Sequence, residues 1–287
     1  MLNYFQAIIL GLLQGIAEPF PISSLGHSVI FPSLFGWNIN QKDPFFLDFL
    51  VATHVATALV FLLFFWKEWV KIIKGIFRSF VARKIKDEDS YAKLGWLLVV
   101  GSIPAGILGV LFQDKLAMIF ASAQIAAAFL MLNGILLYGA ELLRRKAVKV
   151  QDNIDADDRI AKIVTWRQSF YIGAAQALAL IPGLSRSGST MAGGLLVGLS
   201  NEDAAQFSFL LATPIIGAAA LLRLPDLFAT GGTEPLKLAL VGGACAAVAA
   251  YFSVKFLMKF FASNRLTPFA LYCFLAGLGA SIYLWVK

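Results

Sequence analysis

The sequence predicts an all-α polytopic membrane protein with six transmembrane helices and two re-entrant helical hairpins in an inverted repeat. Of its 287 residues, 59% are hydrophobic and 14% are charged, whereas soluble domains carry about 25% charged residues. Uncharged runs long enough to span a bilayer recur along the chain. Two other apolar segments are short and interrupted by proline, glycine and polar residues, which is typical of re-entrant hairpins.

The first hairpin is predicted within residues 1–37. Residues 1–17 are apolar and uncharged, but Glu-Pro-Phe-Pro at 18–21 stops them short of a full span. A second short apolar run follows and ends at Trp37. Residues 45–66 then form the first span, which contains His54. For this histidine we weigh packing or polar support against a place in a functional site.

Two basic segments set the predicted topology. Residues 67–93 begin with apolar residues at helical spacing opposite basic ones, which predicts an amphipathic helix at the membrane interface. Spans at 94–112 and 116–140 separate this segment from a second basic loop at 141–167. Because two crossings place both basic segments on one side, the positive-inside rule makes that side the cytoplasm and puts both termini outside.

The second half of the chain repeats the pattern of the first. A shift of 162 positions places Gly11 on Gly173, Gln14 on Gln176 and Ser23 on Ser185. The second broken hairpin and the spans after it are predicted at 168–181 with 187–200, and at 204–222, 236–258 and 267–286.

Three crossings lie between the two hairpins, so the two halves are predicted to be inverted relative to each other. They occupy residues 1–140 and 168–287 of a single membrane domain, 1–287, and the cytoplasmic loop 141–167 joins them. Inverted repeats with broken helices hold their site near the midplane of the membrane. We therefore expect the tips of the two hairpins to meet there.

The tip of the second hairpin has the composition of an anion site. Residues 182–190 read Pro-Gly-Leu-Ser-Arg-Ser-Gly-Ser-Thr, and Arg186 is the only charged residue between Arg167 and Glu202. An arginine at membrane depth is costly and is read as functional by default, although an ordinary polar loop could let it snorkel to lipid headgroups. The helix expected from Met191 would point its N-terminus at an anion, and the guanidinium fork suits phosphate oxygens. The predicted phosphate cradle consists of Ser23, Ser185, Arg186, Ser187, Gly188, Ser189 and Thr190.

The tip of the first hairpin supplies the ionisable partners. Glu18 in a low-dielectric pocket needs a cation, a proton or a metal; Arg186 is the obvious cation, and Mg²⁺ bridging phosphate oxygens is the obvious metal. His27 is predicted to be the nucleophile or a general acid–base tuned by Glu18, with a structural interfacial histidine as the alternative. Ser24 is the competing nucleophile if His27 serves as its base. Direct attack by water stays open.

These residues resemble a known family. Residues 14–18, Gln-Gly-Ile-Ala-Glu, and 21–27, Pro-Ile-Ser-Ser-Leu-Gly-His, resemble the first signature of bacterial undecaprenyl-diphosphate phosphatases of the bacitracin-resistance type, and residues 182–190 resemble the second. The resemblance covers essentially the whole chain. It implies a phosphatase of the bacterial inner membrane that converts undecaprenyl diphosphate to undecaprenyl phosphate, the lipid carrier for cell-wall precursors. It also implies bacitracin resistance, an active site that faces the periplasmic or outer side, and dependence on Mg²⁺ or Ca²⁺.

By position, the resemblance assigns catalytic roles to Glu18, His27 and Arg186. The sequence departs from the family pattern at Gln14, where glutamate is frequent. A glutamine can still coordinate a cation through its carbonyl oxygen but adds no charge, which weakens a two-carboxylate metal site formed with Glu18. Leu25, Pro19 and Asn201 are further departures. None of them removes the acid, the imidazole or the arginine, so we expect an active enzyme.

Other functions compete with a phosphatase. A transporter or lipid flippase would use the same inverted repeat and polar midplane, and fold alone does not decide between them. A purely structural membrane protein gives no reason to place Glu18, His27 and Arg186 in apolar hairpins. The net charge of +7 is concentrated in two loops, which favours topology determinants beside anionic lipid over a nucleic-acid partner. The expected partners are a polyprenyl diphosphate and the bilayer, and a homo-oligomer stays open.

Overall fold

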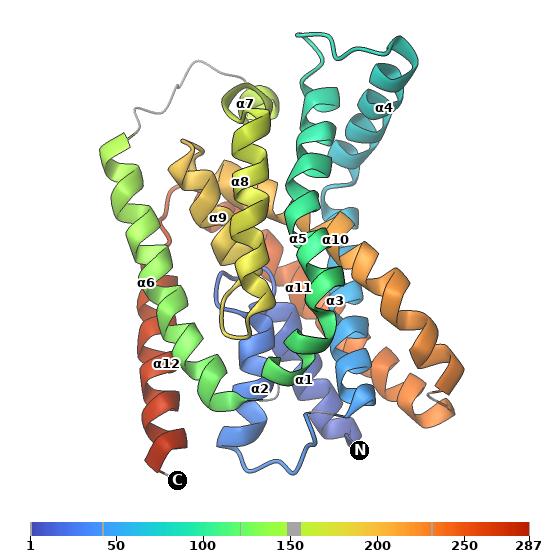
Figure 1. Cartoon of the computed structure of the whole chain (residues 1–287), viewed down its shortest axis with the longest axis vertical. Helices are drawn as coiled ribbons and strands as arrows, with labels where there is room; N and C mark the ends of the chain where they lie inside the picture. The colour runs from blue at the N-terminus through green and yellow to red at the C-terminus, as the bar shows by residue number, and fades with distance from the viewer. Residues whose placement is uncertain (1, 42, 121, 148–155, 231, 287) are drawn as a thin grey trace.

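The computed structural model describes the whole chain except residues 1, 42, 121, 148–155, 231 and 287 (Figure 1). The described residues form helices joined by short turns, with no strand among them. The first half comprises α1 Tyr4–Ala17, α2 Ser24–Leu34, α3 Pro44–Phe64, α4 Trp66–Ala82, α5 Ser90–Phe120 and α6 Ala123–Ala147. The second comprises α7 Ala156–Ile163, α8 Trp166–Ala177, the 3₁₀ turn η1 Leu178–Leu180, α9 Arg186–Leu196, α10 Asn201–Thr230, α11 Thr233–Phe261 and α12 Thr267–Val286.

Within the described residues, six helices are long and apolar enough to cross a membrane, as the sequence predicts. They are α3, α5, α6, α10, α11 and α12. The predicted start of the third span at residue 116 is wrong, because α5 continues through Phe120 and α6 begins at Ala123. The polar residues at 113–115 between the two predicted spans include neither glycine nor proline, and charge alone does not end a helix.

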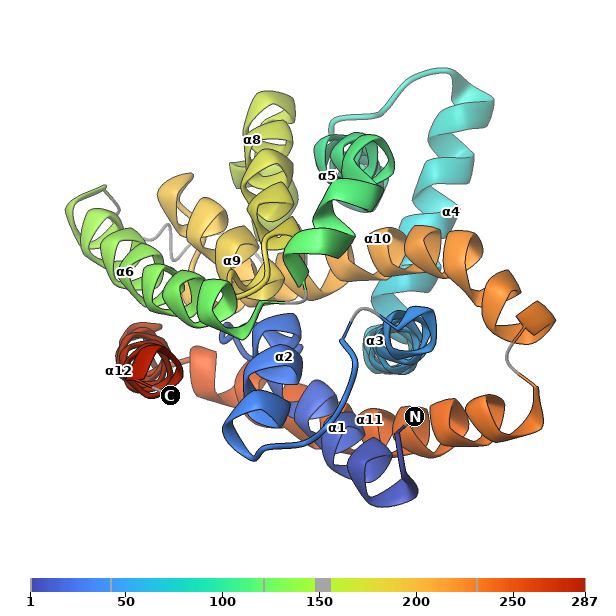
Figure 2. The ribbon, with the colours of Figure 1, turned by 60° about the horizontal axis from the view of Figure 1, so that its bottom comes forward.

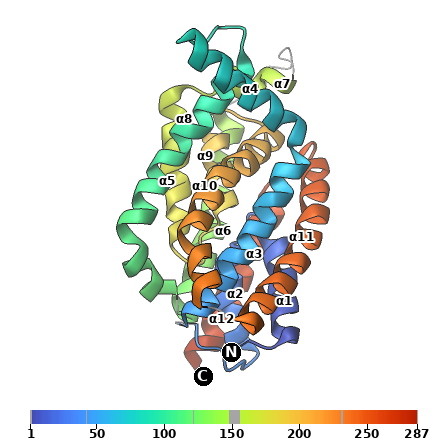
Figure 3. The ribbon, with the colours of Figure 1, turned by 90° about the vertical axis from the view of Figure 1, so that its right-hand side faces the viewer.

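The two basic segments lie at the same end of the molecule. Figures 1 and 3 show α4 and α7 together at the top, and both chain termini at the opposite end. The α4 helix buries Ile72, Gly75 and Ser79 and leaves Ile73 and Phe77 exposed, so its apolar residues form a second face that can meet lipid. Its position at a membrane interface stays a prediction.

The predicted loop at 141–167 is shorter in the structure than the sequence suggested. The α6 helix continues to Ala147, and α7 occupies Ala156–Ile163. Glu141 and Arg144 therefore belong to α6, where Glu141 accepts a hydrogen bond from the backbone N–H of Leu266 at 3.1 Å. Charged residues near a helix C-terminus are compatible with the helix, so their polarity does not mark its end.

The two broken hairpins approach each other from opposite ends of the molecule. In Figure 1, α1 and α2 occupy the half that holds the termini, and α8 and α9 occupy the half that holds α4 and α7. Close backbone packing holds each hairpin to a long helix: a Cβ at Gly11 would overlap the carbonyl of Gly242, and one at Gly173 would overlap the carbonyl of Gly101. Gly11 and Gly173 are the pair that the shift of 162 aligns. The re-entrant character of the hairpins and the inverted halves stay predictions.

Candidate active site

Asn133 of α6 holds the tips of the two hairpins side by side. Its side chain is fully buried; Nδ2 donates to the Pro21 carbonyl at 2.9 Å, and Oδ1 accepts from the Ser185 backbone N–H at 3.0 Å. Ser187 adds a direct bond between the hairpins, since its Oγ donates to the Phe20 carbonyl at 3.0 Å. The two tips therefore meet in one polar centre, as the sequence predicts, and its place at the membrane midplane stays a prediction.

Glu18 contacts most of the polar side chains of this centre and is 4% exposed. Arg186 Nε and Nη2 donate to Glu18 Oε1 at 3.0 and 2.8 Å. Arg186 Nη1 also donates to the Ser208 carbonyl at 3.3 Å. A buried carboxylate requires such a partner, and the predicted pairing of Glu18 with Arg186 is present in the structure.

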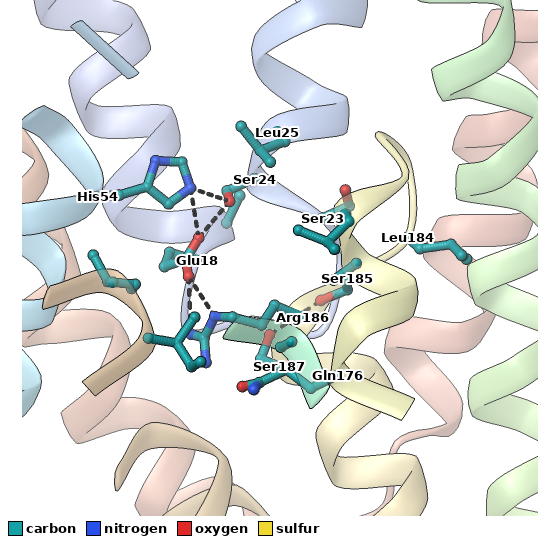
Figure 4. A pocket seen from close by; sticks show the side chains of 16 residues that line it. Glu18, Ser23, Ser24, Leu25, His54, Gln176, Leu184, Ser185, Arg186 and Ser187 are labelled. Carbon is teal, nitrogen blue, oxygen red and sulfur yellow. Dashed lines mark hydrogen bonds and ion pairs between the residues drawn. The ribbon is translucent and has the colours of Figure 1, made fainter. Parts of the chain in front are cut away.

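The second oxygen of Glu18 contacts three polar side chains. Ser24 Oγ donates a hydrogen bond to Oε2, and Gln14 Nε2 donates to the same oxygen at 3.2 Å. His54 Nε2 lies 3.2 Å from the same oxygen and 3.3 Å from Ser24 Oγ. Ser24, Glu18 and His54 thus form a triangle in which each side chain contacts the other two (Figure 4).

The contacts of His54 orient its ring toward the site. Nδ1 lies 2.7 Å from the Leu50 carbonyl, and a carbonyl oxygen only accepts, so Nδ1 carries a hydrogen. This bond leaves Nε2 as the ring nitrogen that faces Glu18 Oε2 and Ser24 Oγ. His54 can therefore exchange a proton with either group.

A cavity of about 140 Å³ lies against this centre. Figure 4 shows Glu18, Ser24, His54 and Arg186 on its wall. Six of the side chains predicted for the site line it: Glu18, Ser23, Ser24, Ser185, Arg186 and Ser187. Gln14, His27, Gly188, Ser189 and Thr190 are not among its lining residues, although Gln14 contacts Glu18 from behind.

The residues of the second signature divide into lining and supporting positions because α9 begins at Arg186. Ser185 is its N-cap and accepts from the Gly188 N–H at 3.0 Å, which closes the first turn. Thr190 Oγ1 donates to the Arg186 carbonyl at 2.8 Å and stays within the helix. Ser189 is buried, and its Oγ has no hydrogen-bond partner among the described residues. Direct phosphate contacts from Gly188, Ser189 and Thr190 stay a prediction.

Ser23 is held in a conformation that few residues other than glycine adopt. Its φ is 69°, and strained positions of this kind cluster at functional sites. Two contacts hold it there: Ser23 Oγ accepts from the Gly26 N–H at 3.2 Å, and His27 Nδ1 donates to the Ser23 carbonyl at 2.7 Å. The strained turn points the next residue, Ser24, into the site.

His27 does not pair with Glu18, contrary to the expectation from the sequence. Its Nδ1 bonds to the Ser23 carbonyl, and its Nε2 lies 2.7 Å from Tyr272 Oη of α12. The two hydrogen bonds occupy both nitrogens of the His27 ring. The approach of α12 could not be read from the hairpin sequence. The imidazole beside Glu18 and Ser24 belongs to His54, for which the sequence analysis left a functional place open.

Gln176 is, beside His54, a polar lining residue that sequence reasoning did not assign to the site. It is 2% exposed, it lines the cavity, and neither its Nε2 nor its Oε1 has a hydrogen-bond partner among the described residues. A buried amide without partners is costly. Its alignment with Gln14 under the shift of 162 was the signal that could have identified it.

The described residues do not form a preformed divalent-cation site. No group of three or more His, Cys, Asp or Glu side chains among them could hold a metal. Glu18 is the only carboxylate among the described lining residues, and both of its oxygens are already bonded. Gln14 Oε1 lacks a partner among the described residues, but one amide oxygen does not replace the several hard ligands that Mg²⁺ and Ca²⁺ require.

Comparison with known proteins places this geometry in a family. The chain matches the family described as bacitracin resistance protein BacA over residues 7–279. It is 44% identical to the undecaprenyl-diphosphatase of Mycolicibacterium paratuberculosis (strain ATCC BAA-968 / K-10) over 98% of this chain and 97% of the relative. It is 45% identical to undecaprenyl-diphosphatase 1 of Burkholderia pseudomallei (strain 1106a) over 94% and 93% of the two chains. The chain is a multi-pass membrane protein of the BacA family.

Proposed function

We propose that this protein hydrolyses undecaprenyl diphosphate to undecaprenyl phosphate and inorganic phosphate, the activity after which its relatives are named. The observation that carries the proposal is the Ser24–Glu18–His54 triangle with Arg186 on the wall of one buried cavity. It combines a hydroxyl nucleophile, proton acceptors and a bidentate phosphate ligand. Release of the lipid carrier for cell-wall precursors and resistance to bacitracin follow from this activity.

Arg186 is the group that binds the terminal phosphate. Its side chain is 13% exposed and borders the cavity, while its guanidinium bonds to Glu18 Oε1. A phosphate in the cavity competes with Glu18 for this fork, and a switch of Arg186 to phosphate frees Oε1 to accept a proton. Gln176 offers a second donor, its Nε2. This group has no hydrogen-bond partner among the described residues, and a bound substrate would provide one.

Ser24 is the nucleophile that the geometry favours. Its Oγ attacks the terminal phosphorus, and its proton passes to Glu18, with His54 beside both groups. The bond between phosphorus and the bridging oxygen breaks, and undecaprenyl phosphate leaves with the electron pair. Water then attacks the phosphoserine, the bond to Oγ breaks, and inorganic phosphate is released. Ser24 Oγ takes back the proton that Glu18 held. The oxygen and both hydrogens of the water leave with the inorganic phosphate as H₂PO₄⁻.

Release of phosphate by the purified protein tests the activity. In detergent, the wild type is expected to release inorganic phosphate from undecaprenyl diphosphate, because hydrolysis needs no bilayer while flipping does. Since the described residues form no preformed cation site, we propose that Mg²⁺ or Ca²⁺ enters with the diphosphate. Addition of a chelator is then expected to slow turnover, while either cation alone leaves the melting temperature of the substrate-free protein unchanged. No phosphate release under either condition would favour the flippase alternative.

We propose that the end of the molecule that bears α4 and α7 faces the cytoplasm, because its basic residues match the positive-inside rule. The site then lies at mid-membrane and opens toward the periplasmic or outer side of the bacterial inner membrane. The bilayer and the polyprenyl diphosphate are its partners. A homo-oligomer is a further expectation, which chemical cross-linking of the purified protein would test.

Cysteine labelling in intact cells tests this orientation. We expect Thr233→Cys to react with a membrane-impermeant thiol reagent and Lys84→Cys to be protected, because three spans, α5, α6 and α10, separate the two positions. Cys245 is replaced by alanine in both variants, while Cys273 is fully buried and stays. Permeabilised cells provide the control in which both introduced cysteines react. The reverse pattern, with Lys84→Cys labelled and Thr233→Cys protected, means that the orientation is inverted.

A further inference from the structure

A second and larger cavity adjoins the polar one. Its volume is about 350 Å³, which lies within the range of roughly 300–1,000 Å³ for small-ligand sites. The two cavities share six lining residues: Leu25, His54, Ala105, Leu180, Ile215 and Ile216. A ligand bound at Arg186 can therefore continue from the first cavity into the second.

The second cavity, which we name the apolar groove, differs from the first in chemistry. Residues from α2, α3, α5 and α10 line it, and Gln41 and His54 are the only polar ones among its described lining residues. Gln41 already donates to the Val29 carbonyl at 2.9 Å, and His54 lies at the junction with the polar cavity. An apolar space of this size favours a hydrocarbon ligand over water.

The groove has an exit to the lipid-facing surface. Val110 of α5 is 56% exposed and Leu222 of α10 is 59% exposed, and both line the groove. Figure 2, which brings the end with the termini forward, shows α2, α3, α5 and α10 around this region. The two cavities together run from Arg186, past His54, to an opening beside Val110 and Leu222, whose exposed apolar side chains can meet lipid.

Two glycines of α5 keep the groove open. A Cβ built at Gly106 or Gly109 would meet no atom within 4 Å, and both residues line the groove. Neither glycine is therefore required there by close packing. A larger side chain at either position would enter the space without displacing a neighbour.

We propose that the apolar groove binds the isoprene units next to the diphosphate, and that Gly106 and Gly109 set the room available to them. The inference rests on the proposed function, because the diphosphate at Arg186 places the start of the prenyl chain at His54. The undecaprenyl chain is far larger than the groove, so the rest of it leaves between Val110 and Leu222 into the bilayer. The groove makes the enzyme selective for prenyl diphosphates over the diphosphate group alone.

Steady-state kinetics with two substrates test the groove. Gly106→Leu and Gly109→Leu are compared with wild type on undecaprenyl diphosphate and on isopentenyl diphosphate, which carries a single isoprene unit. We expect each substitution to lower the ratio of kcat/KM for the long substrate to that for the short one by about tenfold or more, since each fills apolar space that the chain occupies. The matched control is Gly279→Leu on α12, where a Cβ also meets no atom within 4 Å; its ratio stays at the wild-type value.

Photo-cross-linking gives a readout that does not depend on turnover. A polyprenyl diphosphate with a diazirine on its second isoprene unit is expected to label peptides that contain 105–110 or 215–222, and undecaprenyl phosphate should displace it. Displacement by phosphatidylglycerol to the same extent, or an unchanged kinetic ratio in both glycine variants, overturns the proposal. If the wild-type protein is labelled in the groove but releases no phosphate, the proposed function is wrong and the proposal that the groove binds isoprene units still stands.

Discussion

Arg186→Ala is expected to lower the turnover of undecaprenyl diphosphate by roughly 10²–10³-fold. Loss of a preorganised group that stabilises developing charge in the transition state raises the barrier by about 2.7–4 kcal/mol. Arg186 is the cation that borders the cavity and bonds to Glu18 at the same time. Its loss removes the side chain that binds phosphate. The same side chain neutralises Glu18 before substrate binds. Release of inorganic phosphate by the purified variant measures the effect.

Arg186→Lys separates charge from geometry. Lysine keeps the positive charge but cannot form two parallel bonds to a phosphate or a carboxylate. We expect this variant to stay as inactive as the alanine variant. If its activity lies within about twofold of wild type, a point charge is sufficient and the bidentate role of Arg186 is wrong.

Two controls keep this result interpretable. Removal of one partner of a buried ion pair costs about 3–5 kcal/mol of stability, so the melting temperature of each variant in detergent must be measured beside its activity. Gln176→Leu removes a neutral donor from the same cavity, for which a loss of up to roughly tenfold is expected from a net hydrogen-bond contribution of about 0.5–1.5 kcal/mol. A larger loss at Gln176 than at Arg186 would reverse the assignment of the phosphate ligand.

The parts of the fold that the sequence predicts depend on local chemistry. Uncharged runs must be helices in a bilayer because every backbone polar group needs an internal partner, so five of the six spans could be located within a few residues. The third span was misplaced at its start, which is Ala123 and not residue 116. The pairing of Glu18 with Arg186 was also predictable. An acid and a base in apolar hairpins have few other ways to be neutralised.

The parts that the sequence did not predict depend on contacts between distant helices. His27 was expected beside Glu18 because the two belong to one hairpin, but its Nε2 is hydrogen-bonded to Tyr272 of α12. His54 of α3 takes that place beside Glu18 instead, and no spacing within the hairpin indicates how α3 is placed. Asn133 is a similar case: one polar residue in an apolar span, whose two bonds to the hairpin tips appear only once α6 is packed against them.

Ser24→Ala is expected to lower turnover by more than about 10³-fold, because removal of a hydrolase nucleophile costs up to about 10⁶-fold. Ser24 Oγ is the hydroxyl that bonds to Glu18 and contacts His54 on the cavity wall. His27→Ala is expected to slow the enzyme as well, since its Nδ1 holds the Ser23 carbonyl and the strained turn before Ser24. Activity alone therefore does not distinguish the two residues.

The chemistry of a trapped intermediate distinguishes them. Rapid quench with substrate labelled on the terminal phosphate should leave acid-stable, base-labile label on wild-type protein, as a phosphoserine does. The label should disappear in Ser24→Ala and stay acid-stable in His27→Ala. Acid-labile, base-stable label that survives in Ser24→Ala would instead make His27 the nucleophile, and the ring would have to leave Tyr272 to reach phosphorus. Turnover by Ser24→Ala near the wild-type rate without any label would assign the attack to water, with Glu18 and His54 as the groups that position it.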